Sequence, residues 1–217
     1  MRHGAFDGGK LKALALLVAL GAGLHGQVIR TVPYNQVRLD AALDSILAPD
    51  SPLEVLGEHF GLTEGPVWVK DANGGSLLFS DCAANVIYKW RPDAPLSVFL
   101  ERSGFTGSNN LNAGQQTIAG RLAILLIGSN GLALDPQGRL IITAMADRTL
   151  VRLEKDGSRT MLADRYEGKR FSGPNDVVVK SNGSIYFTDS VNGLRGGGDS
   201  PQRNFPTTAS IWLRTGG

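Results

Sequence analysis

Thr63-Glu64-Gly65-Pro66-Val67-Trp68 places a carboxylate directly before a Gly-Pro pair, and an apolar run follows it. Glycine permits backbone paths that side chains resist, and proline fixes φ. We therefore expect Glu64 to be held at a defined angle at the mouth of a β-strand. The alternative is an exposed glutamate in an ordinary turn, and the surrounding sequence decides between the two.

The same arrangement recurs twice along the chain. Asn130-Gly131-Leu132-Ala133-Leu134 follows 66 residues after Glu64, and Asn175-Asp176-Val177-Val178-Val179 follows 45 residues after Asn130. Each opening leads into a turn that contains glycine and then into further strands. The predicted strands are 64–69, 76–81, 85–90 and 96–100 in the first unit, 130–134, 139–143, 149–153 and 159–163 in the second, and 175–179, 184–189 and 210–214 in the third.

Four-stranded units at this period are typical of β-propeller blades. The sequence therefore predicts an all-β propeller of which this chain holds about the first three blades. A β-sandwich would give no reason for the units to resemble one another. The third unit reaches Gly217 before its fourth strand, and the strand expected at 53–58 has no partner in its own unit. We interpret the chain as C-terminally truncated, with strand 53–58 belonging to the last blade of a closed ring.

Composition agrees with this fold class and narrows the partners. The 217 residues include 28 glycines and are 42% hydrophobic, which suits a strand-rich chain with many tight turns. Beyond residue 26 the acidic and basic side chains balance, so nothing indicates a nucleic-acid partner. Cys82 is the only cysteine, which excludes an intramolecular disulfide, and we expect it to be buried beside a strand.

The N-terminus has the pattern of a secretory signal peptide. Arg2, Lys10 and Lys12 precede an apolar run at 13–22 that is too short to span a bilayer. We therefore divide the chain into a signal peptide (1–26), an extension with a short helix near 37–47 (27–52) and a partial propeller (53–217). The protein is expected to be secreted or periplasmic, with no membrane association after signal removal.

The residue types exclude several chemistries. His59 is the only histidine after residue 26, and no G-x-S-x-G motif occurs, so a Ser-His-Asp hydrolase and a histidine-rich zinc site are improbable. Glu64, Asn130 and Asn175 share one register at the mouths of strands that would line a propeller channel. Their oxygens suit a hard cation, although for Asn130 a turn-forming role is the favoured reading. Similarly placed aspartates are expected to cap turns: Asp81, Asp147 and Asp189.

Several motifs together resemble the family of senescence-marker protein (regucalcin), gluconolactonase and luciferin-regenerating enzyme. The resemblance covers about residues 50–194. The stretches that carry it are Glu64-Gly65-Pro66-Val67-Trp68, Leu78-Phe79-Ser80-Asp81, 129–140, Tyr166-Glu167-Gly168-Lys169-Arg170, 174–179 and Tyr186-Phe187-Thr188-Asp189.

This resemblance implies a six-bladed propeller that hydrolyses sugar lactones and related esters with one central divalent metal. It implies that Glu64 is a metal ligand and that Asn175 and Arg170 bind substrate. The implied cation is Ca²⁺ first, with Mg²⁺, Mn²⁺ or Zn²⁺ as alternatives. The resemblance places the general-base aspartate and the remaining metal ligand in later blades, so no catalytic residue is assigned within residues 1–217.

The expected function is metal-dependent hydrolysis of a small-molecule lactone or ester, with little activity from this chain alone. Two alternatives remain open at this point. One is a non-catalytic propeller that binds a partner through its face. The other is half of a split propeller, in which a complementing chain supplies the missing blades.

Overall fold

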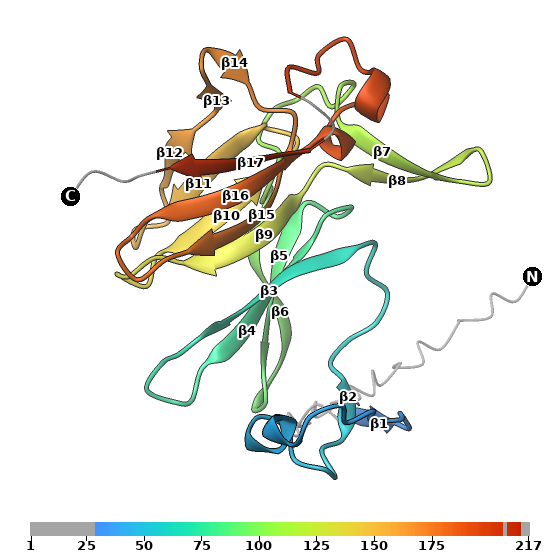
Figure 1. Ribbon diagram of the computed structural model, residues 1–217, viewed down its shortest axis with the longest axis vertical. Coiled ribbons are helices and arrows are strands. Elements are labelled where there is room, and N and C mark those ends of the chain that lie inside the picture. The colour runs from blue at the N-terminus through green and yellow to red at the C-terminus, as the bar shows by residue number, and fades with distance from the viewer. Residues whose placement is uncertain (1–28, 206–207, 214–217) are drawn as a thin grey trace, which may run out of the picture.

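Three antiparallel sheets packed one after another form the body of the molecule in the computed structural model (Figure 1). The structure describes residues 29–205 and 208–213. The first and second sheets have four strands each, and the third has three over these residues. The strands are β3 (Thr63–Val69), β4 (Ser76–Asp81), β5 (Val86–Arg91) and β6 (Ala94–Glu101); β9 (Ser129–Leu134), β10 (Leu140–Ala144), β11 (Thr149–Leu153) and β12 (Arg159–Ala163); and β15 (Pro174–Val179), β16 (Ile185–Ser190) and β17 (Thr208–Leu213).

Every strand predicted for the three units is confirmed to within two residues. Each sheet is a meander whose neighbouring strands follow one another in sequence, as the short glycine turns require. The all-β, propeller-like architecture is therefore confirmed, with four-stranded sheets as its repeating unit.

Apolar side chains fill the two spaces between the sheets. Leu78 and Ile87 of the first sheet pack with Leu140 and Ile142 of the second. On its other face, the second sheet presents Ile141 and a neighbouring leucine to the third sheet. Successive residues of a strand point to opposite faces, so the second sheet is apolar on both sides. Its fully buried strand β10 lies at the centre of the molecule.

The long connections all lie at one end of the sheets, which we call the site end. It is the end at which the first strands β3, β9 and β15 begin, and strands run antiparallel from it. Within the part of the chain that the structure describes, the opposite end holds only tight turns. The site-end connections contain the hairpins β7 (Gly114–Ile118)–β8 (Arg121–Leu126) and β13 (Arg165–Tyr166)–β14 (Lys169–Arg170), and the 3-10 helices η2 (Val191–Gly193) and η3 (Gly197–Asp199).

The N-terminal extension differs from its prediction. Strand β2 (Leu53–Val55) is shorter than the expected 53–58, and it pairs with β1 (Arg30–Val32). The expectation that this strand lacks a nearby partner is therefore wrong. It reflects the difficulty of recognising a three-residue strand such as β1 from sequence, where no alternation of polar and apolar residues can develop.

The short helix is present as the 3-10 helix η1 (Ala41–Ser45), capped by Asp40, whose carboxylate accepts a hydrogen bond from Ala42 N at 2.8 Å. Leu39 and Ile46 remain exposed, so the apolar spacing at 37–47 does not mark a face packed on the sheets. The predicted signal peptide, 1–26, lies outside the described residues. Over the part of the chain that the structure covers, no helix has the length and apolar composition needed to cross a membrane.

Candidate functional site

A β-bulge occurs at the same place in the first strand of each sheet. The register of strand pairing shifts between Glu64 and Val67 in β3, and between Pro174 and Val177 in β15. In the second sheet it shifts where β9 pairs with Ile142 and Ala144 of β10. Bulges re-aim side chains at strand ends. The predicted common register is thus confirmed. Each bulge begins at or next to one of three oxygen-bearing side chains: Glu64, Asn130 and Asn175.

Glycines next to these side chains let the first strands pack backbone to backbone. A Cβ added at Gly65 would lie 2.3 Å from the carbonyl oxygen of Asn130, and one added at Gly131 would lie 2.9 Å from that of Asn175. Real Cβ atoms do not approach so closely. The glycines therefore set Glu64, Asn130 and Asn175 at successive positions along one edge of the site end.

Buried hydroxyls join the sheets at the same level. Ser80 Oγ of the first sheet lies 2.7 Å from Ser129 Oγ of the second. Thr143 of the second sheet lies within hydrogen-bond distance of two carbonyl oxygens, Asn175 O at 2.7 Å and Gly131 O at 3.1 Å. Because Thr143 is fully buried, these contacts fix the backbone that carries Asn175. Sequence reasoning missed this role, although the hydroxyl residues before the strand ends share a register.

Cys82 lies directly behind Glu64. Burial, followed by the carboxylates of Glu64 and Asp81, raises the pKa of the Cys82 thiol to about 12. Its Sγ lies 3.1 Å from the Ser129 carbonyl oxygen. The prediction that Cys82 is buried beside a strand is confirmed, since its side chain is fully buried after β4. Glu64 itself is exposed, so its carboxylate can reach a ligand.

The structure places Arg170 in β14, within the site-end connection that leads to β15. Arg170 Nη2 donates a hydrogen bond to the Asp147 carbonyl oxygen at 3.0 Å. Burial of Arg148 lowers the pKa of its guanidinium below the usual range, and the positive charge of the neighbouring Arg170 lowers it further. Arg148 in turn donates hydrogen bonds to the Phe171 carbonyl oxygen and to Gln202. The two guanidinium groups lie close together in the site-end connections before β11 and β15, and we call them the cationic rim.

The predicted turn caps are confirmed for all three aspartates. Asp81 accepts hydrogen bonds from the backbone N–H groups of Gly61 and Leu62, Asp147 from that of Thr106, and Asp189 from those of Ser172 and Gly173. The prediction that Asp147 shares a register with the other two is wrong. Strand pairing aligns Asp81 with Ala144 and Asp189, and Asp147 lies three residues further on, in the turn. The burial of Asp189 raises the pKa of its carboxyl despite the N–H groups that it binds.

The donor chemistry fits a hard cation. One carboxylate and two carboxamides offer the oxygen ligands that Ca²⁺ and Mg²⁺ prefer. Within residues 29–205 and 208–213, no group of three or more His, Cys, Asp and Glu side chains is arranged to hold a metal. Glu64 is therefore the charged member of this candidate set, and the carboxamides of Asn130 and Asn175 are its neutral members.

Sheets of this kind, packed in series with oxygen-bearing side chains at one end of their first strands, define an all-β, propeller-like protein with a candidate cation site. Residues 62–204 match the SMP-30/Gluconolactonase/LRE-like region, and the chain belongs to this family. This confirms the resemblance inferred from the motifs.

Two relatives carry the name gluconolactonase. The gluconolactonase of Zymomonas mobilis subsp. mobilis is 37% identical over 172 residues, which are 79% of this chain and 44% of that protein. The structure of a gluconolactonase from Xanthomonas campestris, described as important in glucose secondary metabolic pathways, is 26% identical. It matches with a TM-score of 0.58 over 86% of this chain and 52% of that chain. The chain thus spans about half the length of these relatives.

Proposed function

We propose that this chain contributes to the metal-dependent hydrolysis of sugar lactones or related esters. The observation that carries the proposal is the recurrence of an oxygen-bearing side chain at one bulge position in three adjoining first strands. A structural role alone would not require Glu64, Asn130 and Asn175 to have oxygen ligands in common. The gluconolactonases that the chain is similar to supply the substrate class.

Each residue has a definite role in this proposal. Glu64 holds a divalent cation, Ca²⁺ first and Mg²⁺, Mn²⁺ or Zn²⁺ as alternatives, with Asn130 available as a neutral ligand. Asn175 donates and accepts hydrogen bonds with the sugar hydroxyls. Arg170 offers planar donors to hydroxyls or to the product carboxylate. A bound divalent cation polarises an ester carbonyl and stabilises the charge that develops on its oxygen.

The reaction also needs a group that activates water. The proposal assigns no residue of this chain to that role, because the carboxylates Asp81 and Asp189 are occupied by backbone N–H groups. We place the activity outside the cytoplasm, since residues 1–26 have the pattern of a secretory signal.

The test is hydrolysis of glucono-1,5-lactone, followed in a pH-stat and corrected for spontaneous hydrolysis, with Ca²⁺ and then with chelator. We expect a low rate of Ca²⁺-stimulated turnover, because this chain supplies a cation site without a water-activating residue, and chelator should remove that rate. Glu64→Gln should lower the Ca²⁺-dependent rate by on the order of 10²-fold, the effect of losing one charge-stabilising group. Glu101→Gln is the matched control, because Glu101 is an exposed carboxylate at the end of β6. Folded protein without chelator-sensitive turnover would contradict the proposal.

A further inference from the structure

The segment before β3 and the first sheet enclose a cavity of about 510 Å³, which we call the extension cleft. The segment contributes residues 53–57 and Phe60, and the first sheet contributes Glu64, Leu77 and Phe79. Small-molecule sites have volumes of this order and are lined mainly by apolar and aromatic side chains with a few polar groups. The extension cleft has this composition, so it is a candidate ligand site.

The floor of the extension cleft is the face of the first sheet that points away from the second sheet. Leu78 packs towards the second sheet, and successive residues of a strand point to opposite faces. Leu77 and Phe79 therefore point into the extension cleft, which both of them line. Phe79 is 9% exposed and Leu77 is half-buried, so the floor is apolar and meets a ligand mainly at Leu77.

Aromatic rings hold the opposite wall in place. The ring centroid of Phe60 lies 5.2 Å from that of Phe79, edge to face, and 5.2 Å from that of Tyr88. A Cβ added at Gly57 would lie 2.8 Å from Phe60 Cζ, so glycine lets the chain pass close over this ring. Because aromatic pairs in such arrangements stabilise one another, the extension cleft is formed before a ligand arrives.

The charged side chains of the extension cleft are both acidic. Glu54 and Glu64 line it, and none of its described lining residues is basic. Glu64 is the candidate cation ligand and is exposed. The extension cleft thus leads from the apolar surface at Leu77 to a carboxylate that can hold a cation. An ester bound there would place its carbonyl at the cation and its apolar part against the floor.

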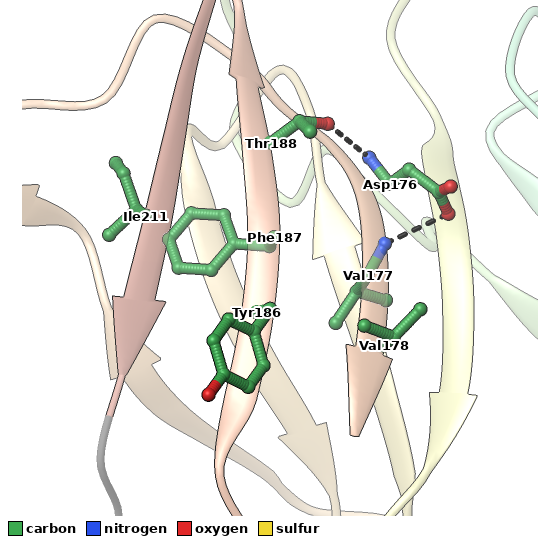
Figure 2. A pocket seen from close by; sticks show the side chains of 7 residues that line it. All are labelled: Asp176, Val177, Val178, Tyr186, Phe187, Thr188 and Ile211. Carbon is green, nitrogen blue, oxygen red and sulfur yellow. Dashed lines mark hydrogen bonds between the residues drawn. The ribbon is translucent and has the colours of Figure 1, made fainter. Parts of the chain in front are cut away.

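A second apolar cavity provides a comparison. It lies on the third sheet, has a volume of about 210 Å³ and is lined in part by Val178 and Phe187 (Figure 2). The carboxylate in this second cavity, that of Asp176, accepts a hydrogen bond from Val177 N at 2.8 Å. None of the three candidate oxygen ligands lines it. Of these two cavities, the extension cleft is the one that joins apolar surface to the candidate site.

We propose that the extension cleft binds the alkyl chain of a lactone or ester whose carbonyl oxygen lies at the cation held by Glu64. This inference rests on the proposed function and narrows its substrate class to molecules that carry such a chain. Each CH₂ group that leaves water contributes about fourfold to affinity. A sugar hydroxyl placed against Val55, Phe60 and Leu77 would lose its hydrogen bonds to water without replacement. The extension cleft therefore favours an alkyl chain over a polyhydroxyl chain.

The test compares two lactams that resist hydrolysis, those of δ-decanolactone and δ-valerolactone, which share one ring and differ only in a pentyl chain. Their affinities for the unaltered chain are measured by NMR titration, with Ca²⁺ and with chelator. We expect the pentyl lactam to bind roughly tenfold more tightly, the effect of burying about two of its CH₂ groups. Chelator should weaken both lactams equally, because the carbonyl loses its cation while the pentyl chain keeps its contacts.

Two variants alter the extension cleft and leave Glu64 in place. Val55→Phe puts a ring in the space for the chain and should lower the preference for the pentyl lactam roughly tenfold. Leu53→Gln should lower it roughly threefold, and because Leu53 is 47% exposed, this variant keeps the fold even where Val55→Phe does not. Leu122→Gln is the matched control, since Leu122 is 56% exposed and lies on β8, outside the extension cleft. Circular dichroism verifies folding.

The outcomes separate this inference from the proposed function. Equal affinities for the two lactams, or a preference that Val55→Phe and Leu53→Gln leave unchanged, would overturn the inference. A pentyl preference in a protein that hydrolyses no lactone would support the extension cleft and count against the proposed function. Chelator-sensitive hydrolysis of glucono-1,5-lactone without a pentyl preference would overturn the inference and leave the proposed function standing.

Discussion

At the scale of single residues, Thr143 connects packing to the candidate site. Its buried hydroxyl lies 2.7 Å from the carbonyl oxygen of Asn175. Replacing it by valine keeps the shape and leaves that oxygen without its partner, which costs about 1–3 kcal/mol. We expect Thr143→Val to lower the free energy of unfolding by this amount, measured by urea denaturation, and to weaken Ca²⁺ binding measured by calorimetry.

Thr143→Ser is the conservative variant for this test. It keeps the hydroxyl and removes one methyl group, whose burial is worth about 0.8 kcal/mol. Calcium affinity should therefore recover in Thr143→Ser while part of the stability loss remains. Equal calcium affinities in the serine and valine variants would show that the hydroxyl does not position Asn175.

Cys82 gives a prediction about pH. Burial and the nearby Glu64 and Asp81 carboxylates raise the pKa of its thiol to about 12 from the ordinary 9.0. Above pH 9 the thiol ionises in the unfolded chain but not in the folded chain, so protein stability falls as pH rises through this window, by about 1.4 kcal/mol per unit.

The measurement compares the free energy of unfolding of the unaltered chain and of Cys82→Ser between pH 8 and pH 11. The difference between the two should shift in favour of the serine variant as pH increases, because serine does not ionise there. The native thiol should also resist a disulfide reagent at pH 8 and react fully in urea. A native thiol that reacts as quickly as an unfolded one would contradict the assigned environment.

At the scale of elements, the approach of the first strands depends on glycine. A Cβ at Gly131 would lie 2.7 Å from Asp176 Cα and 2.9 Å from the Asn175 carbonyl oxygen. Backbone atoms cannot move aside as a flexible side chain can, so Gly131→Ala should displace β15 and cost about 1–3 kcal/mol. It should also weaken Ca²⁺ binding, because Asn175 moves with the strand.

Gly138 is the control for this substitution. It has φ of +73° and open space around a built Cβ, so Gly138→Ala costs only the left-handed backbone strain of roughly 1–2 kcal/mol. Thermal and urea unfolding compare the stabilities, and calorimetry compares the calcium affinities. If Gly138→Ala weakened calcium binding as much as Gly131→Ala, the close strand approach would not be what holds the site.

Sequence reasoning located the strands of the three sheets because their apolar runs repeat with glycine turns between them. It could not locate β7, β8, β13 and β14, since these hairpins belong to single connections and nothing elsewhere in the chain resembles them. Repetition revealed the register of Glu64, Asn130 and Asn175 for the same reason. It did not reveal the contact of Thr143 with Asn175. Hydroxyl residues recur at this register, but the sequence does not show which carbonyl oxygen on another sheet a hydroxyl contacts.

At the scale of the whole molecule, the two ends of the sheets have different tasks. The far end closes every described strand pair with a tight turn, while the site end carries the long connections, two of which are joined by the bridge between Ala113 and Leu194. Loops held on a rigid scaffold are where binding residues concentrate. The three candidate oxygen ligands and the rim arginines Arg148 and Arg170 all lie at this end, so one end of the molecule combines ligand chemistry with adaptable loops.

A cation bound at this end stabilises the whole molecule, since a ligand that binds only the folded chain adds RT ln(1 + [L]/Kd) to the free energy of unfolding. At a Ca²⁺ concentration of about 100 times Kd this amounts to about 2.7 kcal/mol. We expect Ca²⁺ to raise the melting temperature measured by calorimetry, and chelator to reverse the increase. Glu64→Gln should abolish the increase and Glu101→Gln should retain it. This measurement needs no substrate, so it separates cation binding from turnover. An equal calcium effect in both variants would show that Ca²⁺ binds elsewhere and that the three bulges do not form a cation site.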